Sequence, residues 1–307
     1  MRHDTAGDPI TGVKWSRRTT RKVAEELTTL GIAVSKNTVG RLLKEMDFKL
    51  RVNRKQIAST KNPERNQQFL YIAEQRESFG NRCLPIISVD TKKKEPIGNF
   101  KNAGAKWDRE TVLVKDHDFR SEADGLAIPY GIYDPQANRG AVFVGTSHNT
   151  PAFAVDAIAQ WWLKEGCQRY PTARELFILA DGGGSNGPRC RVWRKALQDT
   201  ICTPLGLVVT VSHYPPGASK WNPIEHRLFS QISKNWAGEP LTDIDKILNF
   251  IRTTKTKSGL LVSAYLIPEN YDTGIKIPDA EMRQLNLVPN EKLGRWNYTI
   301  RPTQNVN

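Results

Sequence analysis

The sequence predicts an α/β protein in which helices cover a mixed β-sheet, preceded by a small helical unit. Two observations carry this prediction. From residue 83 onward, short apolar runs typical of buried strands alternate with helix-like segments. Before them, residues 20–46 show apolar positions at helical spacing, interrupted by a glycine. With 307 residues, the chain is long enough for two domains with substantial cores.

The N-terminal region carries most of the surplus positive charge. The chain has 45 Lys and Arg against 32 Asp and Glu, which gives a net charge of +13. Residues 1–65 hold 15 basic and 7 acidic residues, so +8 of this surplus lies there. A basic block of this kind favours a nucleic-acid partner. A charge that only maintains solubility would look the same, so both interpretations stay open on charge alone.

Residues 20–46 are typical of a helix-turn-helix, with Gly31 at the turn and Ser35 as the cap of the second helix. The expected inward face of the two helices consists of Val23, Ala24, Leu27, Leu30, Thr38, Val39, Leu42, Leu43 and Met46. The basic, alternating residues 49–55 predict a wing strand. We expect DNA contacts from Lys36, Asn37, Arg41, Lys44, Arg51, Arg54 and Lys55. An ordinary helical hairpin with solvated charges is the alternative.

The order of elements after residue 60 predicts a ribonuclease-H-like domain. A connecting helix over 62–82 precedes it. The expected elements are strands 84–90, 126–133 and 141–145, helix 151–166, strand 175–180, helix 188–199, strand 207–213 and a long helix from 223. Strand-like residues 260–265 and 296–300 then pack back on this domain. The predicted division is 1–60 (helix-turn-helix), 61–82 (connecting helix), 83–255 (catalytic domain) and 256–307 (C-terminal extension).

Three acidic residues stand at element ends in this scheme. Asp90 and Asp181 end strands, 91 residues apart, and Glu225 begins a helix 44 residues later. Taken singly, each Asp is more often a loop cap, and a Glu in a first helical turn suits the helix dipole. Together in one cleft they would repel one another without a cation. Carboxylates are ligands that suit Mg²⁺, so the sequence predicts a metal site formed by these three residues.

Further residues near these carboxylates are candidates for DNA contacts: Lys92, Lys93, Asn186, Lys220 and Trp221. The Lys92–Lys93 run is usually a solvated loop, but here it follows Asp90. The glycine-rich residues 182–187 lack the Gly-Lys-Ser/Thr ending of a nucleotide-binding loop, and we expect them to let DNA approach Asp181. Trp221 is either a core residue or a stacking platform for an unpaired base.

The cysteines and the apolar runs exclude several classes of protein. Cys83, Cys167, Cys190 and Cys202 form no CxxC pair, and we expect reduced, mostly buried thiols in a cytoplasmic protein. No apolar run approaches the ~20 residues that span a bilayer, and the N-terminus lacks a signal-peptide core. We therefore expect no membrane partner.

Three sequence blocks make the chain recognisable. They are residues 88–95 (SVDTKKKE), 180–187 (ADGGGSNG) and 215–229 (PPGASKWNPIEHRLF). The chain resembles the DDE transposases of the Rhodopirellula-type (ISAzo-type) insertion sequences over most of residues 10–300, and the last block also resembles mariner-like transposases. The resemblance implies a ribonuclease-H-like fold, divalent-metal dependence, and a catalytic triad of Asp90, Asp181 and Glu225. Members of this family often begin with another helix-turn-helix unit upstream, which predicts a shortened copy here.

The sequence thus predicts a bacterial, nucleoid-associated DNA transposase that cuts transposon ends and joins the 3′-hydroxyl to target DNA. Two Mg²⁺ ions, or Mn²⁺ in their place, would serve the chemistry. The expected partners are inverted-repeat and target DNA, bound by a homodimer or a higher oligomer. Two alternatives stay open: a truncated, non-catalytic protein that binds transposon ends, and a ribonuclease-H-type nuclease without strand transfer.

Overall fold

The computed structural model describes residues 5–7, 14–16, 18–49, 63–218, 221–291 and 293–303. The chain divides into two compact units, residues 1–58 and 59–307, each of which has its own core. No helix among these described residues is both long and apolar enough to cross a bilayer.

The N-terminal unit contains the predicted pair of helices. They are α1 (Thr20–Thr29) and α2 (Lys36–Glu45), and a short antiparallel pair of strands, β1 (Thr5–Gly7) and β2 (Lys14–Ser16), precedes them. The side chains of Thr19 and Ser35 accept hydrogen bonds from the backbone N–H of Lys22 and Thr38, which caps both helices. Gly31 adopts a φ of +82°, a conformation that glycine tolerates at a helix end.

The core of this unit is smaller than the sequence predicted. Val23, Ala24 and Val39 are buried, and Leu27, Val34 and Leu43 pack partly against them. Leu30, Leu42 and Met46, which we expected to face inward, are exposed. Two short helices have too little opposing surface to cover these outer positions. The expected wing lies outside the described residues from residue 50 on.

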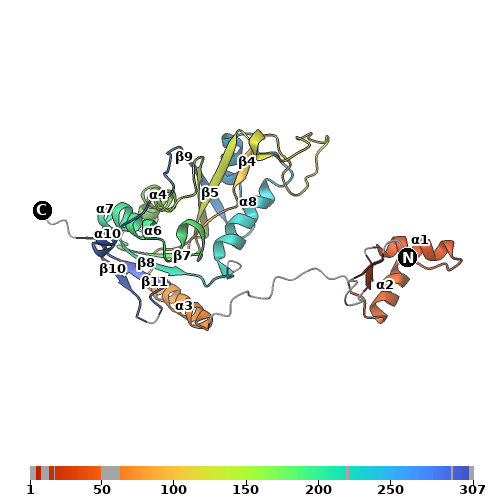
Figure 1. Cartoon of the computed structure of the whole chain (residues 1–307), viewed down its shortest axis with the longest axis horizontal. Coiled ribbons are helices and arrows are strands. Elements are labelled where there is room, and N and C mark those ends of the chain that lie inside the picture. Colours follow the sequence, from red (N-terminus) through yellow and green to blue (C-terminus); the bar gives the residue numbers. More distant parts are fainter. Residues whose placement is uncertain are drawn as a thin grey trace. The chain divides into compact units, whose positions relative to one another are not determined.

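The second unit is built on a nine-stranded mixed sheet with the order β10-β11-β8-β7-β3-β5-β6-β9, to which β4 adds beside β5 (Figure 1). The strands are β3 (Ile86–Thr91), β4 (Glu95–Ile97), β5 (Gly125–Asp134), β6 (Arg139–Gly145), β7 (Glu175–Ala180), β8 (Val208–His213), β9 (Leu261–Ile267), β10 (Leu287–Pro289) and β11 (Asn297–Ile300). β3, β5 and β6 run antiparallel, and β7 and β8 continue the sheet parallel to β3. This is the ribonuclease-H-like order that the sequence predicted.

Helices cover both faces of this sheet. The longer ones are α3 (Arg65–Asn81), α4 (Pro151–Trp161), α6 (Arg191–Ala196), α8 (Ser230–Asn235) and α9 (Ile244–Arg252). Shorter segments complete the chain: η1 (Arg120–Glu122), η2 (Trp162–Gly166), α5 (Cys167–Arg169), η3 (Gly184–Asn186), η4 (Leu197–Cys202), α7 (Thr203–Leu205), η6 (Glu225–Phe229) and α10 (Asp279–Arg283). α9 was missed in the sequence, although Asp243 caps it and its apolar residues recur at helical spacing.

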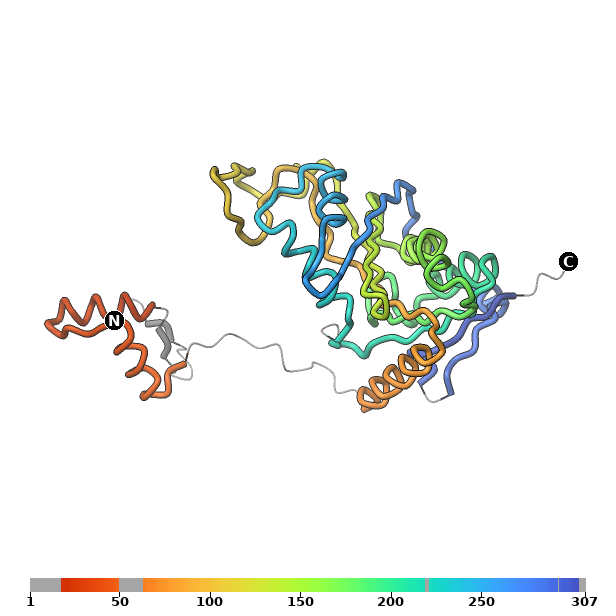
Figure 2. The backbone as a smooth tube through the Cα atoms, turned by 180° about the vertical axis from the view of Figure 1, so that it is seen from behind, coloured from red at the N-terminus to blue at the C-terminus, as the bar shows by residue number. Residues whose placement is uncertain are grey.

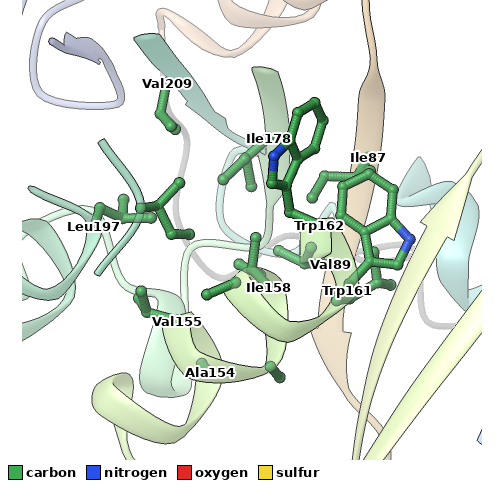
Figure 3. Close-up of a cluster of buried hydrophobic side chains, with 14 of the residues drawn as sticks. Ile87, Val89, Ala154, Val155, Ile158, Trp161, Trp162, Ile178, Leu197 and Val209 are labelled. Atoms are coloured by element: carbon green, nitrogen blue, oxygen red, sulfur yellow. The ribbon is translucent and has the colours of Figure 1, made fainter. Parts of the chain in front are cut away.

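One face of the sheet carries the main apolar core. Figure 3 shows Ile158, Trp161 and Trp162 of α4 and η2 beside strand residues that include Ile87 and Val209. The opposite face is covered in two parts: η6, α8 and α9 pack over β5, β6 and β9, and α3 packs over β3 and β7. Helices on both faces exclude water from the strand interiors, which is the usual requirement for parallel strands.

A buried pair of amides fastens α3 to the sheet. The side chains of Gln68 and Asn297 donate hydrogen bonds to each other's carbonyl oxygens at 2.8 and 2.7 Å, and Gln68 also donates to the carbonyl of His213. In both overall views α3 lies beside β10 and β11 (Figure 2). Polar groups buried in this way contribute to stability only when they are paired, and these are.

The thiols differ in part from expectation. All four cysteines lie within the described residues and are free, as predicted. Only Cys202 is buried, whereas Cys83 is exposed and Cys167 and Cys190 are half-buried. Burial raises the pKa of Cys202 to about 12, so its thiol is inert.

The close packing of η6 on the sheet can be tested at Gly131 of β5. A Cβ atom there would stand 2.4 Å from the Phe229 ring and 2.9 Å from Ile224. We expect Gly131→Ala to lower the free energy of unfolding by about 1–3 kcal/mol, as overpacking does. Urea unfolding measures this. Gly80→Ala is the matched control, because nothing lies within 4 Å of that helical position and it should be neutral or stabilising. A Gly131→Ala protein as stable as the wild type would contradict the close approach.

Candidate active site

Two of the predicted carboxylates sit side by side because of the register between β3 and β7. Val89 of β3 pairs with Ala180 of β7 in parallel, so the residues that follow, Asp90 and Asp181, stand at the same level of neighbouring strands. Such strands lie about 4.8 Å apart. The carboxyl ends of parallel strands are where open α/β sheets commonly place their functional groups.

Glu225 reaches the same position from the helix that covers the sheet. On its other side, Asp90 pairs with Gly131 of β5. The space that a side chain at this position would fill is occupied by Ile224 and Phe229, which flank Glu225 in sequence. The missing side chain at Gly131 thus lets the start of η6 lie against the sheet next to Asp90. A glycine inside a strand often marks such an approach, and this signal was available in the sequence.

The loop before Glu225 is tied to the strand that carries Asp90. The hydroxyl of Ser88, two residues before Asp90 and on the same face of β3, donates a hydrogen bond to the side-chain oxygen of Asn222. Both residues are fully buried. The backbone carbonyl of Asn222 then accepts from the N–H of Glu225 at 3.2 Å. Sequence reasoning did not predict this connection, because a buried serine in a strand gives no signal of its partner.

The electrostatics show that the three carboxylates form one cluster. Burial, together with the negative charges of Asp181 and Glu225, raises the pKa of Asp90 to about 8, although a hydrogen bond from the N–H of Thr91 acts in the opposite direction. Burial and the charge of Glu225 also raise the pKa of Asp181, while the N–H of Gly183 lowers it. Asp90 and Asp181 are therefore harder to ionise, first because they are partly buried and then because other carboxylates are near.

The three carboxylates, in the side-chain orientations that the structure shows, do not point at a common metal position. Within the described ranges, no group of three His, Cys, Asp or Glu side chains is arranged to hold a metal ion. The donor chemistry nevertheless fits a hard divalent cation, because the groups are carboxylates whose mutual repulsion such a cation would relieve. Binding of a metal would require the side chains to rotate toward a common point.

A groove of about 450 Å³ opens beside Glu225 between η6–α8 and the segment that follows β3. Lys92 and Lys93 line it, but in different ways. Lys92 is buried, donates to Glu95 at 2.8 Å and lies 4.5 Å from the centre of the Trp236 ring. Lys92 therefore stabilises the wall of the groove through Glu95 and Trp236, which corrects the expectation that this lysine contacts DNA. Lys93 is exposed and remains a candidate for DNA contact.

Asn186 also has a different position from the one expected. It is buried, and its side-chain oxygen accepts hydrogen bonds from Tyr130 at 3.1 Å and Ser185 at 3.3 Å. The Nε2 atom of His213 forms a hydrogen bond of 2.8 Å with the backbone carbonyl oxygen of Asn186. Asn186 therefore fixes the glycine-rich loop after Asp181 and cannot reach DNA. Burial raises the pKa of Tyr130, as do the charges of Asp90 and Asp181, so this phenol stays protonated.

The remaining predicted DNA-contacting residues divide into described and undescribed ones. Trp221 is 47% exposed, and the Arg65 guanidinium lies 5.3 Å from its ring centre, so it belongs to the surface and not to the core. On α2, the side chains of Lys36, Asn37, Arg41 and Lys44 are all exposed, as expected. Arg51, Arg54, Lys55 and Lys220 lie outside the described residues.

Comparison with known proteins identifies the chain. Residues 1–302 match the family described as Rhodopirellula transposase DDE domain. The chain belongs to this family. The resemblance predicted from the three sequence blocks is thereby confirmed.

Solved structures and curated sequences add less. The chain is similar to the Mos1 transposase in a paired-end complex with the left transposon end, at 18% identity, with 76% of this chain and 65% of that chain covered and a TM-score of 0.45. A Mos1 mariner paired-end complex with Mn gives 16% identity, 76% and 65% coverage and a TM-score of 0.44. The chain thus spans about 65% of the length of these Mos1 chains. No curated protein sequence matches it.

The raised pKa of Asp90 predicts how the stability of the metal-free transposase depends on pH. The folded protein holds this proton up to about pH 8, whereas an unfolded chain releases it near pH 4. The contribution of Asp90 to stability is therefore fully present below pH ~4 and is lost as the pH rises toward ~8. Asp90→Asn should remove this loss, and so be more stable than the wild type at alkaline pH by a few kcal/mol.

Urea unfolding in EDTA across this pH range measures the difference. Asp272→Asn, an exposed aspartate outside the cluster, is the control and should follow the wild-type curve. If Asp90→Asn instead lowers stability at every pH, the carboxylate has a structural hydrogen-bonding role and the charge cluster is not the source of the pKa shift.

Proposed function

We propose that this DDE transposase cuts transposon ends and joins the freed 3′-hydroxyl to target DNA, with Asp90, Asp181 and Glu225 as its catalytic residues. The observation that carries the proposal is the convergence of these three carboxylates, which the β3–β7 register and Gly131 bring to one place. Three partly buried acids, whose proximity raises the pKa of Asp90 and Asp181, are costly for a purely structural site. Their retention is reasonable where a cation compensates for the cost.

The three residues would hold two Mg²⁺ ions, which Mn²⁺ can replace. When bound, two such ions activate the attacking oxygen and stabilise the leaving oxygen of a phosphodiester. The N–H of Thr91 engages one oxygen of Asp90 and orients its carboxylate. The connection from Ser88 through Asn222 holds the backbone at Glu225, so that its longer side chain can close on the site.

The surroundings of the carboxylates would position the DNA. Lys93, exposed at the rim of the neighbouring groove, is suited to a backbone phosphate. Trp221 is half-exposed in the loop before Glu225, where an unpaired base could stack on it. Lys220 next to it would add a further phosphate contact.

The N-terminal unit would recognise the inverted repeats. The exposed residues of α2 are suited to the major groove, as in other helix-turn-helix proteins, and the basic residues after it to phosphates. Binding two transposon ends at once requires at least two copies of the chain, so we propose a homodimer or higher oligomer on DNA. The site of action would be the bacterial nucleoid.

The catalytic assignment is tested by Asp181→Asn, in which an amide replaces a carboxylate and is a weaker ligand for Mg²⁺. We expect this variant to bind end-containing DNA as the wild type does and to lose cleavage by at least about a hundredfold, the range expected for a catalytic group. Gel-based cleavage and strand-transfer assays on paired inverted repeats measure this, with Asp272→Asn as the control. Cleavage at the wild-type rate would refute the assignment.

The same assay separates the alternatives for the wild-type protein. Cleavage followed by joining supports a transposase. Nicking without joining indicates a nuclease, and binding without either reaction indicates a non-catalytic end-binding protein.

Sequence recognition by α2 is tested by Arg41→Ala. If this side chain reaches a base, selectivity for the inverted repeat should fall by about 1–3 kcal/mol, with little change in binding to scrambled DNA. Arg21→Ala on α1 is a closely matched control, because both arginines are exposed and pair with a glutamate four residues later. The distance is 3.9 Å for Arg41 and Glu45 and 3.7 Å for Arg21 and Glu25. Gel-shift titrations with inverted-repeat and scrambled DNA measure the selectivity of each variant. Equal losses of selectivity in the two variants would exclude α2 as the specific reader.

A further inference from the structure

A second cavity lies on another side of the helix that carries Glu225. It has a volume of about 780 Å³ and lies between α3, η6–α8 and the segment before β9. Its polar lining includes Arg76, His226, Arg227, Gln231, Thr256 and Ser258, and none of its lining residues is acidic. The carboxylate groove is lined by a different set of residues from η6 and α8, which includes Glu225, Phe229 and Ser233.

Arg76 and Arg227 are the main charges of this cavity. Both are exposed, and within the described part of the chain neither forms an ion pair or a hydrogen bond. Arg76 lies beside the face of α3 that packs on the sheet, because it follows the buried Ile72 by four residues. The positive charge of Arg227 is close enough to Tyr133 to oppose the rise in the pKa of that phenol that burial causes.

The opposite wall supplies hydroxyl groups on a fixed loop. The hydroxyls of Thr256 and Ser258 lie 2.9 Å apart, and the side chain of Asn138 donates to the carbonyl of Ser258 at 2.9 Å. Lys255 and Lys257 flank Thr256 in sequence and are exposed. The wall therefore combines a backbone fixed by Asn138 with hydroxyl groups, and it lies in a basic segment of the sequence.

We propose that this cavity is a phosphate-binding site that takes backbone phosphates of DNA outside the carboxylate groove, with Arg76 and Arg227 as the contacting groups. Two guanidinium groups without a carboxylate partner repel each other, and an anion between them removes that repulsion. Arginine binds phosphate through two parallel hydrogen bonds, and hydroxyl groups add neutral donors. That the phosphate belongs to DNA rests on the proposed function, whereas the preference for a phosphate group does not.

The test uses the full-length chain, without divalent metal, and a duplex that lacks the inverted repeat. Fluorescence anisotropy at several salt concentrations gives the affinity and its salt dependence. In the double variant Arg76→Gln/Arg227→Gln we expect the slope of log affinity against log salt to fall by about 2, one for each lost phosphate contact. Affinity should fall about tenfold at moderate salt. Arg283→Gln, an exposed arginine of α10, is the control and should change neither.

A second arm distinguishes DNA from a free phosphate compound. Thermal unfolding is followed with and without inorganic pyrophosphate for the wild type and for both variants. Loss of DNA affinity in the double variant alone supports the proposal. Unchanged DNA affinity, with stabilisation by pyrophosphate that the double variant lacks, overturns the DNA assignment. No difference in either arm overturns the site. If the wild type shows no strand transfer, the proposed function is refuted, but these binding results still test the phosphate site.

Discussion

The close approach of η6 to the sheet at Gly131 is the constraint on which the carboxylate cluster depends. Asp90 and Asp181 are neighbours through strand register alone, but Glu225 belongs to a helix in another layer. A side chain at Gly131 would push Ile224 and Phe229 away and move Glu225 with them. Gly140 of β6 repeats the arrangement, since a Cβ there would stand 2.5 Å from Leu228. Two glycines in adjacent strands thus form the surface on which the helix rests.

The cluster is costly, and hydrogen-bonded polar groups surround it, although the buried side-chain nitrogen of Asn222 has no hydrogen-bond partner among the described residues. Burying like charges together disfavours the ionised state, which raises the pKa of Asp90 and Asp181. The neighbouring polar groups are paired: Ser88 with Asn222, Lys92 with Glu95, and Tyr130 with Asn186. The extensive apolar core on the other face holds the strands in register. Among these acidic groups, the raised pKa values of Asp90 and Asp181 mark where the electrostatics is unfavourable.

The helix from Glu225 to Asn235 separates a groove lined by both acidic and basic residues from a cavity lined by basic residues without acidic ones. On one side Glu225 faces a groove whose buried lysine is already neutralised by Glu95. On the other side Arg227 and Arg76 face a cavity without acidic lining. Under the proposed function, the protein would have to attract phosphates without placing its own cations beside the carboxylates. Arg76 and Arg227, which form no ion pair with any described residue, lie on a different side of the helix from Glu225, which would meet both requirements.

The sequence by itself indicated three candidate carboxylates, the order of most strands and helices of the sheet domain, and the family. These depend on local signals: apolar runs that end on an acid, capping residues, and three short motifs. It also placed the exposed residues of α2, because helical spacing fixes which side chains share a face. Tertiary structure decided what depends on distant partners. Lys92 is buried beside Trp236, and Asn186 is buried beside Tyr130. Leu42 is exposed because its unit is small. Arg76 and Arg227, which are 151 residues apart in the sequence, line the same cavity only because α3 and η6 pack on the same face of the sheet. No local pattern encodes such contacts, since they follow from the register of strands and the close approach of helices.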